Sequence, residues 1–352
     1  MELGITTFVE TTPNVITGET ISHGERLRQV VEEIKLADAV GIDVFGVGEH
    51  HRSDYAASSP EVILAAAATQ TKHIKLTSAV TVLSSVDPVR AFEQFATLDG
   101  LSSGRAEIMA GRGSFIESFP LFGYDLADYN ELFDEKLNLL LNLQKNEFVT
   151  HEGKLRPSID GLGIYPRPVQ DEIPIWIASG GTPSSSIRAG QLGLPMTFAI
   201  LGGNPLAFGR VIALYRQAAV EAGHDLSKMK VAINSHGFIA RSNEEAIEKF
   251  FPPTQVVMNK IGRERGWPPY TKESFLHANG MDGAIYAGDP DTIAKKIILL
   301  KEHLGIDRFY LQTPVGSMDH ADVLSCIELF GKEVAPRVKE MAAIIDEENA
   351  KL

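Results

Sequence analysis

Short runs of apolar residues alternate with longer amphipathic segments along almost the whole chain. A run that is apolar at every position is typical of a strand buried on both faces of a parallel sheet. Segments of this kind are predicted to be strands at residues 3–8, 44–48, 76–82, 106–110, 173–178, 196–201, 231–240 and 308–312. Because parallel strands need long crossover connections, usually helices, the pattern restricts the chain to an α/β fold.

Proline marks the start of several of the expected helices. It is tolerated in the first helical turn because its missing N–H would have no partner there. A residue able to cap a helix precedes each proline in the pairs Ser59-Pro60, Asp87-Pro88, Thr182-Pro183, Asn204-Pro205 and Asp289-Pro290. The repeated order of strand, polar loop and capped helix predicts a (β/α)8 TIM barrel. The alternative, an open doubly wound sheet, usually has a glycine fingerprint after its first strand, which "ITTFVETTP" lacks.

Two stretches interrupt the alternation and are predicted to be insertions after strands four and seven. Residues 150–172 are rich in glycine and proline, which suggests an excursion with a short hairpin. Residues 251–287 contain "FFPPTQ" and "GRERGWPPYT" and are expected to form a lid or a mobile loop. Basic side chains beside Trp267 are expected on a solvated helix face, with a lid cation as the alternative: Lys260, Arg263 and Arg265. No linker divides the chain, so residues 1–352 are predicted to form a single domain.

Composition narrows the range of partners and compartments. The formal net charge of -13 argues against a nucleic-acid partner and against docking on an anionic membrane. The single cysteine, Cys326, lies in an apolar helical pattern and is expected in the core, without a disulfide. The sequence has no signal-peptide pattern at its start and no apolar run of ~20 residues. We therefore predict a cytoplasmic protein without a membrane span.

In a barrel of this kind the active site lies at the C-terminal ends of the strands. Polar or glycine-rich sequences follow several predicted strands there: "GEHH" at 48–51, "AGRGS" at 110–114, "ASGGTPSSS" at 178–186, "NSH" at 234–236 and "QT" at 312–313. These positions are the candidates for binding and catalysis.

The end of the fifth predicted strand has the features of a phosphate site. Gly180 and Gly181 allow a tight turn and close approach of a ligand to the backbone. They precede a helix start, whose free N–H groups and partial positive charge suit an anion. Arg112, on the neighbouring strand end, could bind phosphate through paired hydrogen bonds. The alternative is that the glycines only form a turn and that Arg112 pairs with an acid of the barrel.

The adjacent residues His50 and His51 could be metal ligands, a general base or ordinary loop residues. Successive residues of a strand point to opposite sides, so both rings cannot face one metal ion. The chain has no H-x-H or H-E-x-x-H pattern, and we expect no metal site. One histidine is expected to face the pocket, where it could donate a hydrogen bond or move a proton.

Taken together, the motifs resemble those of the bacterial luciferase-like flavin-dependent oxidoreductases, the luciferase-like monooxygenases. The matching stretches are "GEHH" at 48–51, "TLDGLSSGRAEIMAGRGS" at 97–114, "IPIWIASGGTPSS" at 173–185, "IARSNEEA" at 239–246 and "AGDPDTIAKKI" at 287–297. They follow the order found in the family and cover most of the chain.

The resemblance implies a homodimeric (β/α)8 barrel with a flavin over its mouth. It implies that the phosphate is held by donors after strands four and five, here Arg112, Gly113, Ser179, Gly180 and Gly181. In relatives a bulge in strand three, often with a non-prolyl cis peptide, supports the flavin ring, and the matching positions here are Ser78, Ala79 and Val80. The first histidine of "EHH", which is tied to catalysis in luciferase, is His50. Gly111 stands where luciferase has a reactive cysteine, which argues against light emission.

The function implied is an FMN-dependent monooxygenase. Reduced FMN, delivered by a separate flavin reductase, would react with oxygen, and a small-molecule substrate would be oxygenated with His50 assisting proton transfer. A dehydrogenase dependent on the deazaflavin F420 is the alternative on the same fold. A flavin-binding protein without catalytic activity is the third hypothesis.

Overall fold

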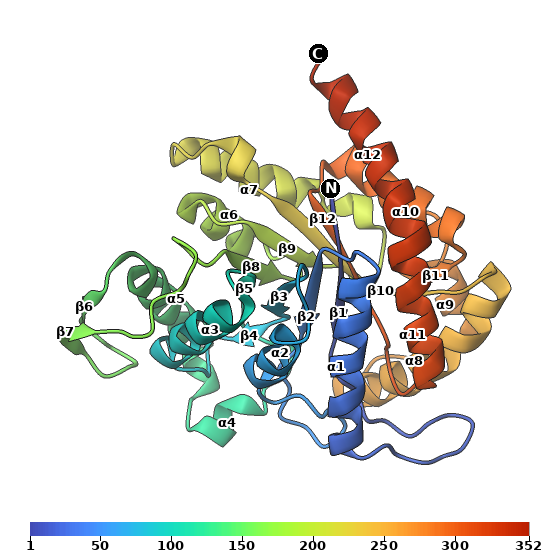
Figure 1. The fold of residues 1–352 in the computed structure, drawn as a ribbon, viewed down its shortest axis with the longest axis horizontal. Helices are drawn as coiled ribbons and strands as arrows, with labels where there is room; N and C mark the ends of the chain where they lie inside the picture. The colour runs from blue at the N-terminus through green and yellow to red at the C-terminus, as the bar shows by residue number, and fades with distance from the viewer. Residues whose placement is uncertain (352) are drawn as a thin grey trace.

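A computed structural model describes residues 1–351, and within them eight parallel strands close into a barrel (Figure 1). The strands are β1 (Glu2–Thr7), β2 (Val44–Val47), β3 (Lys75–Ser78), β5 (Ala106–Gly111), β8 (Ile175–Ser179), β9 (Met196–Ala199), β10 (Val231–Ile239) and β12 (Arg308–Gln312). The ring closes because β1 pairs with both β2 and β12, while β10 pairs with both β9 and β12. The predicted fold class is confirmed, and each predicted strand overlaps an observed one.

The third predicted strand, residues 76–82, is divided in the structure. β3 ends at Ser78, and β4 (Thr81–Val82) resumes the pairing with β5 two residues later. The peptide bond between Ala79 and Val80, in the gap, is cis.

Helices cover the outside of the barrel (Figure 1). They are α1 (His23–Ala39), α2 (Pro60–Ala68), α3 (Pro88–Ser102), α4 (Ser118–Phe122), α5 (Tyr129–Lys145), α6 (Pro183–Leu192), α7 (Gly209–Glu221), α8 (Asn243–Arg265), α9 (Lys272–Ala278), α10 (Pro290–Leu304), α11 (His320–Leu329) and α12 (Ala335–Asn349). Short 3-10 turns lie at Leu126–Asp128, Pro205–Phe208 and Leu226–Lys228, and a π-helical turn at Phe330–Val334 joins α11 to α12. Among residues 1–351, no helix combines the length and apolarity needed to cross a bilayer.

The prolines begin these helices as the sequence predicts. The side chain of Asp87 accepts hydrogen bonds from the N–H groups of Val89 and Arg90, and Asp289 accepts one from Thr292. Each bond satisfies a donor that the first helical turn would otherwise leave free. These caps place the strand-to-helix loops, and therefore the side chains they carry, at one end of the barrel.

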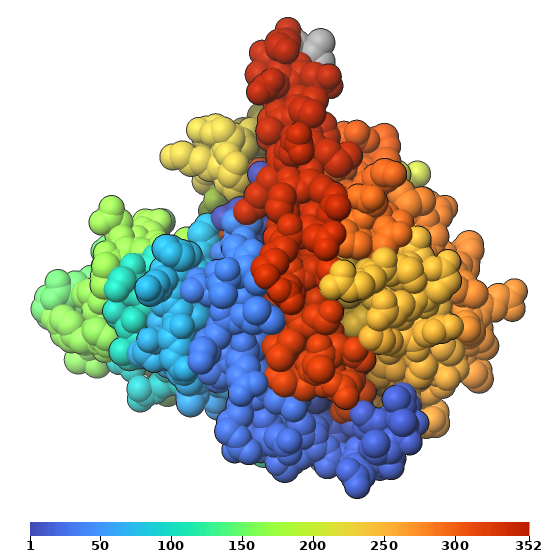
Figure 2. Space-filling view, turned by 45° about the vertical axis from the view of Figure 1, so that its right-hand side comes forward, coloured from blue at the N-terminus to red at the C-terminus, as the bar shows by residue number. Residues whose placement is uncertain are grey.

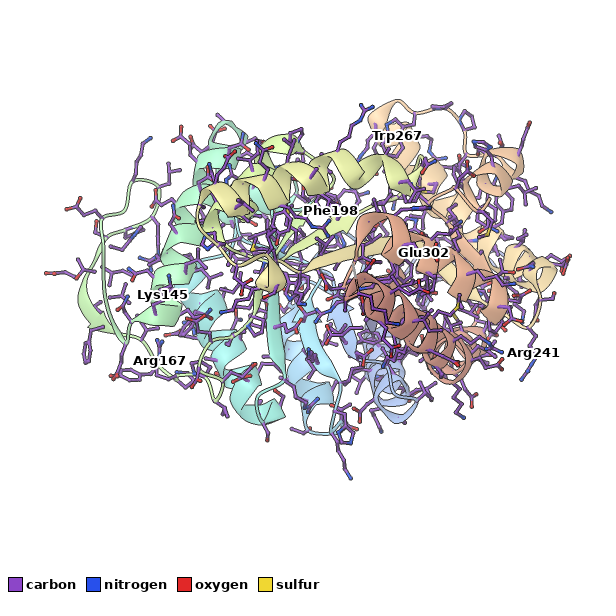
Figure 3. The ribbon with its side chains drawn as sticks, turned by 90° about the horizontal axis from the view of Figure 1, so that it is seen from above. Lys145, Arg167, Phe198, Arg241, Trp267 and Glu302 are labelled. Atoms are coloured by element: carbon purple, nitrogen blue, oxygen red, sulfur yellow. The ribbon has the colours of Figure 1, made fainter. Side chains whose placement is uncertain are left out.

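The glycine- and proline-rich stretch at 150–172 contains part of an antiparallel hairpin. β6 (Phe148–His151) pairs with β7 (Ile159–Gly163), and the hairpin projects from the side of the barrel beside α5 (Figure 1). Arg167 fixes the segment that follows by donating hydrogen bonds to the carbonyl groups of Leu143 and Gln144 at the end of α5. Lys145 and Arg167 mark this side of the molecule in Figure 3.

The stretch at 251–287 differs from the prediction of an open lid or loop. α8 begins at Asn243 and continues through Pro252 and Pro253 to Arg265. Proline inside a helix removes a hydrogen bond and usually kinks or ends it. Here Phe250, Pro253 and Val257 are buried against the core, and this burial outweighs the local cost of proline. The segment then forms α9 and a short strand, β11 (Tyr286–Gly288), which extends the pairing of β10.

The N-terminal end of the barrel interior is filled by a buried ion pair. Arg308 donates to both carboxylate oxygens of Glu107, at 2.6 and 3.0 Å, and its guanidinium lies 4.4 Å from the ring centre of Trp176. Arg308 is 1% exposed, so the pair closes this end to solvent. The opposite end, where the strands finish, is left as the place for a site.

Candidate active site at the barrel mouth

A cavity of about 370 Å³ lies at the C-terminal end of the barrel, and we call it the mouth cavity. Its walls are mainly apolar and come from loops and from α8: Phe8, Phe115, Leu201, Met258, Ile261 and Trp267. Its polar groups are few: Glu10, Tyr55, Ser114, His236, Arg265 and Gln312. An apolar pocket with a few convergent polar groups is typical of a small-molecule site. Trp267, labelled in Figure 3, lies in the loop after α8.

His50 and His51 occupy different surroundings. The His50 ring lies behind the wall of the mouth cavity, with ring centres of Phe8 and Tyr55 each 4.4 Å away and that of Phe115 5.3 Å away. Its Nε2 is buried and has no hydrogen-bond partner within residues 1–351. Burial lowers the pKa of His50 to about 3, so the ring is neutral near pH 7.

His51 is held by a carboxylate. Its Nε2 lies 2.9 Å from Oε1 of Glu49, and Oε2 of Glu49 accepts a hydrogen bond from the backbone N–H of Val82, also at 2.9 Å. Glu49 thus links the loop after β2 to β4 and holds His51, while His50 retains an unused ring nitrogen. Within residues 1–351, no group of three or more His, Cys, Asp or Glu side chains is arranged to hold a metal ion.

Arg112 and the start of α6 come together at the ends of β5 and β8. Arg112 donates from Nη1 to Oδ1 of Asn130 at 2.6 Å and from Nη2 to Oγ of Ser185 at 3.2 Å. Both partners are neutral, and in the part of the chain described here Arg112 has no salt bridge to a carboxylate. The alternative that Arg112 pairs with an acid is therefore wrong, and its positive charge is available to an anion.

The glycine turn after β8 lies beside this guanidinium group. Oγ of Ser179 accepts hydrogen bonds from the N–H groups of Gly181 and Thr182, at 3.1 and 3.3 Å, which orders the turn. Gly181 has a φ of +97°, a conformation that favours glycine. A Cβ on Gly180 would meet no atom within 4 Å, so the space beside this residue is open. Gly113, after Arg112, also has a positive φ, of 76°.

The third strand contributes a tightly bonded polar residue and two small apolar ones. Oγ of Ser78 accepts hydrogen bonds from the N–H of Met109 at 3.2 Å and from Oγ1 of Thr81 at 2.8 Å. Val80 packs on Gly111, where a Cβ would lie 2.8 Å from Val80 Cγ2. Gly111 therefore has no room for a side chain unless Val80 moves.

Strands β10 and β12 bring their polar residues into the barrel. Oγ1 of Thr6 donates to Oδ1 of Asn234 at 2.6 Å, and Nδ2 of Asn234 donates to Oε1 of Gln312 at 2.9 Å. His236 lies two residues after Asn234 on the same strand and faces the mouth cavity. Burial lowers the pKa of His236 to about 4. Ser235 points the other way and donates to the carbonyl group of Ile200.

The cations at the end of α8 lie at the surface, as predicted, but two of them also make contacts with other loops. Nη2 of Arg265 donates to the carbonyl group of Ser114 at 2.7 Å, and its guanidinium lies over the rings of Phe115 and Trp267. Nζ of Lys260 lies 2.9 Å from Oδ2 of Asp54. These contacts fix α8 across the loops after β2 and β5, which makes it part of the mouth.

Sequence reasoning missed Glu10, Tyr55 and Phe115, all of which line the mouth cavity. Glu10 follows the first strand closely, so the rule applied to the other strand ends could have found it. Phe115 lies one residue beyond the "AGRGS" stretch, whereas Tyr55 is brought in by a loop that the sequence pattern does not position.

Comparison with known proteins agrees with the motifs. A family model described as luciferase-like monooxygenase matches residues 1–308. N-acetyl-S-alkylcysteine monooxygenase of Bacillus subtilis (strain 168) is 31% identical over 188 residues, which cover 52% of this chain and 54% of that protein. 3,6-diketocamphane 1,6-monooxygenase of Pseudomonas putida is 25% identical over 348 residues, which cover 86% of this chain and 90% of that protein.

Solved structures share the fold over nearly the whole chain. Monooxygenase RslO1 from Streptomyces bottropensis superposes with a TM-score of 0.82 at 22% identity, covering 96% of this chain and 99% of that one. The oxygenating constituent of 3,6-diketocamphane monooxygenase from Pseudomonas putida, in complex with FMN, gives 0.74 at 24% identity, with coverage of 96% and 99%. An F420-dependent secondary alcohol dehydrogenase, in complex with an F420-acetone adduct, gives 0.72 at 22% identity, with coverage of 96% and 98%.

Proposed function

The chain belongs to the luciferase-like monooxygenase family, and on that basis we propose that it uses reduced FMN and oxygen to oxygenate a small organic substrate. Family membership makes it an oxidoreductase, which disfavours the hypothesis of a flavin-binding protein without activity. The choice of FMN, the substrate, the homodimer and the cytoplasmic location remain predictions.

The observation that carries the proposal is the uncompensated guanidinium of Arg112 beside the start of α6. It lies next to Ser185, in the first turn of that helix, and both its side-chain partners are neutral. A guanidinium and a helix N-terminus together favour a phosphate group. The open space at Gly180 would let the phosphate reach the backbone there. Arg112, Gly113, Ser179, Gly180 and Gly181 would hold the phosphate of FMN.

The ring of the cofactor would lie toward the mouth, against Ser78, Ala79 and Val80. The Ser78 hydroxyl is committed to bonds with Met109 and Thr81, so it fixes this segment. When bound, the reduced flavin would supply the electrons that activate oxygen. The mainly apolar walls of the mouth cavity would bind an apolar substrate and exclude water from it.

His50 would move a proton at Nε2. This nitrogen has no partner within residues 1–351, and the ring is neutral near pH 7 because burial lowers the pKa of His50 to about 3. A neutral imidazole can accept a proton or, in its other tautomer, donate one. The aromatic rings of Phe8, Tyr55 and Phe115 hold the imidazole in place.

We propose that a separate flavin reductase supplies the reduced cofactor. The diketocamphane enzyme is described as the oxygenating constituent of its system, which implies a second constituent that supplies reduced flavin. By the same reasoning, this chain would carry out the oxygenation and a second protein would reduce the flavin.

The second candidate is an F420-dependent dehydrogenase, favoured by the similarity in fold to the secondary alcohol dehydrogenase. Titration of the apoprotein with FMN and with F420, followed by flavin fluorescence, separates the two. Our proposal predicts saturable binding of FMN. It also predicts that oxygen uptake with reduced FMN yields an oxygenated product from at least one compound in a panel of cyclohexanone, decanal and methyl phenyl sulfide. Binding of F420 alone would overturn the monooxygenase assignment.

A further inference from the structure

Glu10 lies between two cavities. It follows β1, is 2% exposed, and its Oε2 has no hydrogen-bond partner among residues 1–351. On one side it lines the mouth cavity. On the other it lines a polar cavity of about 470 Å³ between residues 14–22, α1 and α11, which we call the outer cavity. Glu10 is the only described residue that lines both. Figure 2 shows the first loop in dark blue below α11, on this side of the molecule.

The backbone is strained where it directs Glu10 inward. Val9 has a φ of 58°, a left-handed conformation that a β-branched residue rarely adopts. The strained turn is held by antiparallel bonds: the N–H of Ala56 donates to the carbonyl of Val9, and the N–H of Thr11 donates to the carbonyl of Asp54. Strain of this kind is concentrated at functional sites, where the surrounding structure maintains it.

The groups around Glu10 leave its carboxyl without a partner of opposite charge. Arg26, the nearest cation on the outer side, already donates to both carboxylate oxygens of Glu33, at 2.6 and 3.2 Å. The titratable and charged groups on the elements packed around Glu10 are Glu19, Glu25, Arg26, Glu33, Asp54, Tyr55, His236, Arg265 and His320. Burial raises the pKa of Glu10 to about 8, which is consistent with a carboxyl group that holds its proton near pH 7.

We propose that Glu10 is a catalytic acid–base residue that carries a proton from the outer cavity to the substrate in the mouth cavity. This inference rests on the proposed monooxygenase function, since it assumes a substrate in that cavity. The O–H bond of the Glu10 carboxyl breaks as a new O–H bond forms on a substrate oxygen, which leaves a carboxylate. The carboxylate then takes a proton from a hydronium ion or a buffer acid that reaches it through water in the outer cavity, which leaves water or the buffer base there; one proton moves inward and no electrons are exchanged.

A proton relay is useful here because the mouth cavity is mainly apolar. A cavity that excludes water protects the reaction but also removes the usual source of protons. The outer cavity is lined by groups that can order water, among them Asn14, Glu19, Ser22 and Gln29. A side chain exposed to both spaces can therefore supply protons without opening the mouth.

Glu10→Gln tests the proposal, because glutamine has nearly the same shape and cannot transfer a proton. Glu340→Gln, at an exposed position of α12 away from both cavities, is the matched control. We expect Glu10→Gln to lower kcat by about 100-fold or more, the usual contribution of a general acid, with FMN affinity within about threefold of wild type. Glu340→Gln should match wild type. Wild-type kcat should fall as the pH rises through the pKa of Glu10. The pH profile of kcat for Glu10→Gln should lack this decrease.

Infrared difference spectra of the resting protein supply a readout that needs no turnover. Wild type should show the carbonyl stretch of a protonated carboxylic acid near pH 7, shifted in D₂O, and Glu10→Gln should lack it. Absence of that band from wild type, or a Glu10→Gln kcat within about threefold of wild type, would overturn the relay. A wild-type protein that binds neither FMN nor F420 would instead overturn the proposed function, and that failure is visible before any variant is compared.

Discussion

Nη2 of Arg112 donates a hydrogen bond to Oγ of Ser185 across 3.2 Å, and this contact joins the end of β5 to the first turn of α6. The two residues are far apart in the sequence but belong to neighbouring strand–helix units of the barrel. The contact brings a guanidinium group to a helix N-terminus, which neither unit provides alone. It is the basis for placing the phosphate of the cofactor here.

The two glycines of the turn after β8 should respond differently to alanine. Gly181→Ala forces a side chain onto a φ of +97° and brings its Cβ to 2.7 Å from the Phe208 ring, so we expect a loss of about 1–3 kcal/mol in the free energy of unfolding. Gly180→Ala meets no atom within 4 Å and should leave stability within about 0.5 kcal/mol. It should nevertheless weaken FMN binding, because its methyl group enters the space assigned to the phosphate. Chemical denaturation and FMN titration of both variants measure the two effects. Unchanged FMN affinity in Gly180→Ala would show that the phosphate does not bind beside this residue.

His50→Ala should reduce turnover while leaving cofactor affinity nearly intact. The ring touches aromatic side chains rather than the proposed phosphate site, and its free Nε2 is the atom assigned to proton transfer. We expect kcat to fall by about 100-fold or more, with the dissociation constant of FMN within about threefold of wild type. His277→Ala, at an exposed position of α9, serves as the control. Equal kcat in wild type and His50→Ala would remove His50 from the mechanism.

Acid should destabilise the protein partly through His236. Burial lowers the pKa of His236 from 6.5 to about 4, so the unfolded chain binds more protons than the folded one between these values. The stability contributed by the neutral ring is therefore complete above about pH 6.5 and lost as the pH falls toward 4, amounting to ~3 kcal/mol. Urea denaturation of wild type and His236→Gln at pH 8 and pH 5 isolates the effect. The variant should lose about 2 kcal/mol less than wild type between the two conditions; parallel losses would show that His236 does not titrate in this way.

The sequence predicted the barrel because the signals that specify it are local. Strands buried on both faces are apolar at every position, and prolines at helix starts mark the units, so each strand could be located to within a few residues. α8 was predicted poorly because the local cost of Pro252 and Pro253 is outweighed by burial of Phe250 and Val257, which depends on the rest of the fold.

Candidate site residues could be proposed from the sequence where they follow strand ends, and were missed where they depend on contacts between distant segments. Arg112 and Gly181 lie within two residues of the ends of β5 and β8, so the sequence could propose them, and they remain predicted phosphate ligands. Lys260 and Arg265 were assigned to a solvated face because their partners, Asp54 and the carbonyl of Ser114, come from other loops. Glu10 lies just beyond a predicted strand, but its burial requires α1 and the loop after β2 to pack around it.

The most direct test of the account is the dissociation constant of FMN for wild type and Arg112→Ala. Arg188→Ala is the matched control, since Arg188 lies on α6, the helix that Arg112 contacts through Ser185, but is already paired with Asp134 at 3.0 Å. Loss of a charged hydrogen bond costs about 1.5–3 kcal/mol, so Arg112→Ala should raise the dissociation constant by roughly 10- to 150-fold. Arg188→Ala should leave it unchanged. An Arg112→Ala protein that is folded and binds FMN as tightly as wild type would contradict the assignment of the phosphate site and, with it, the proposed place of the cofactor.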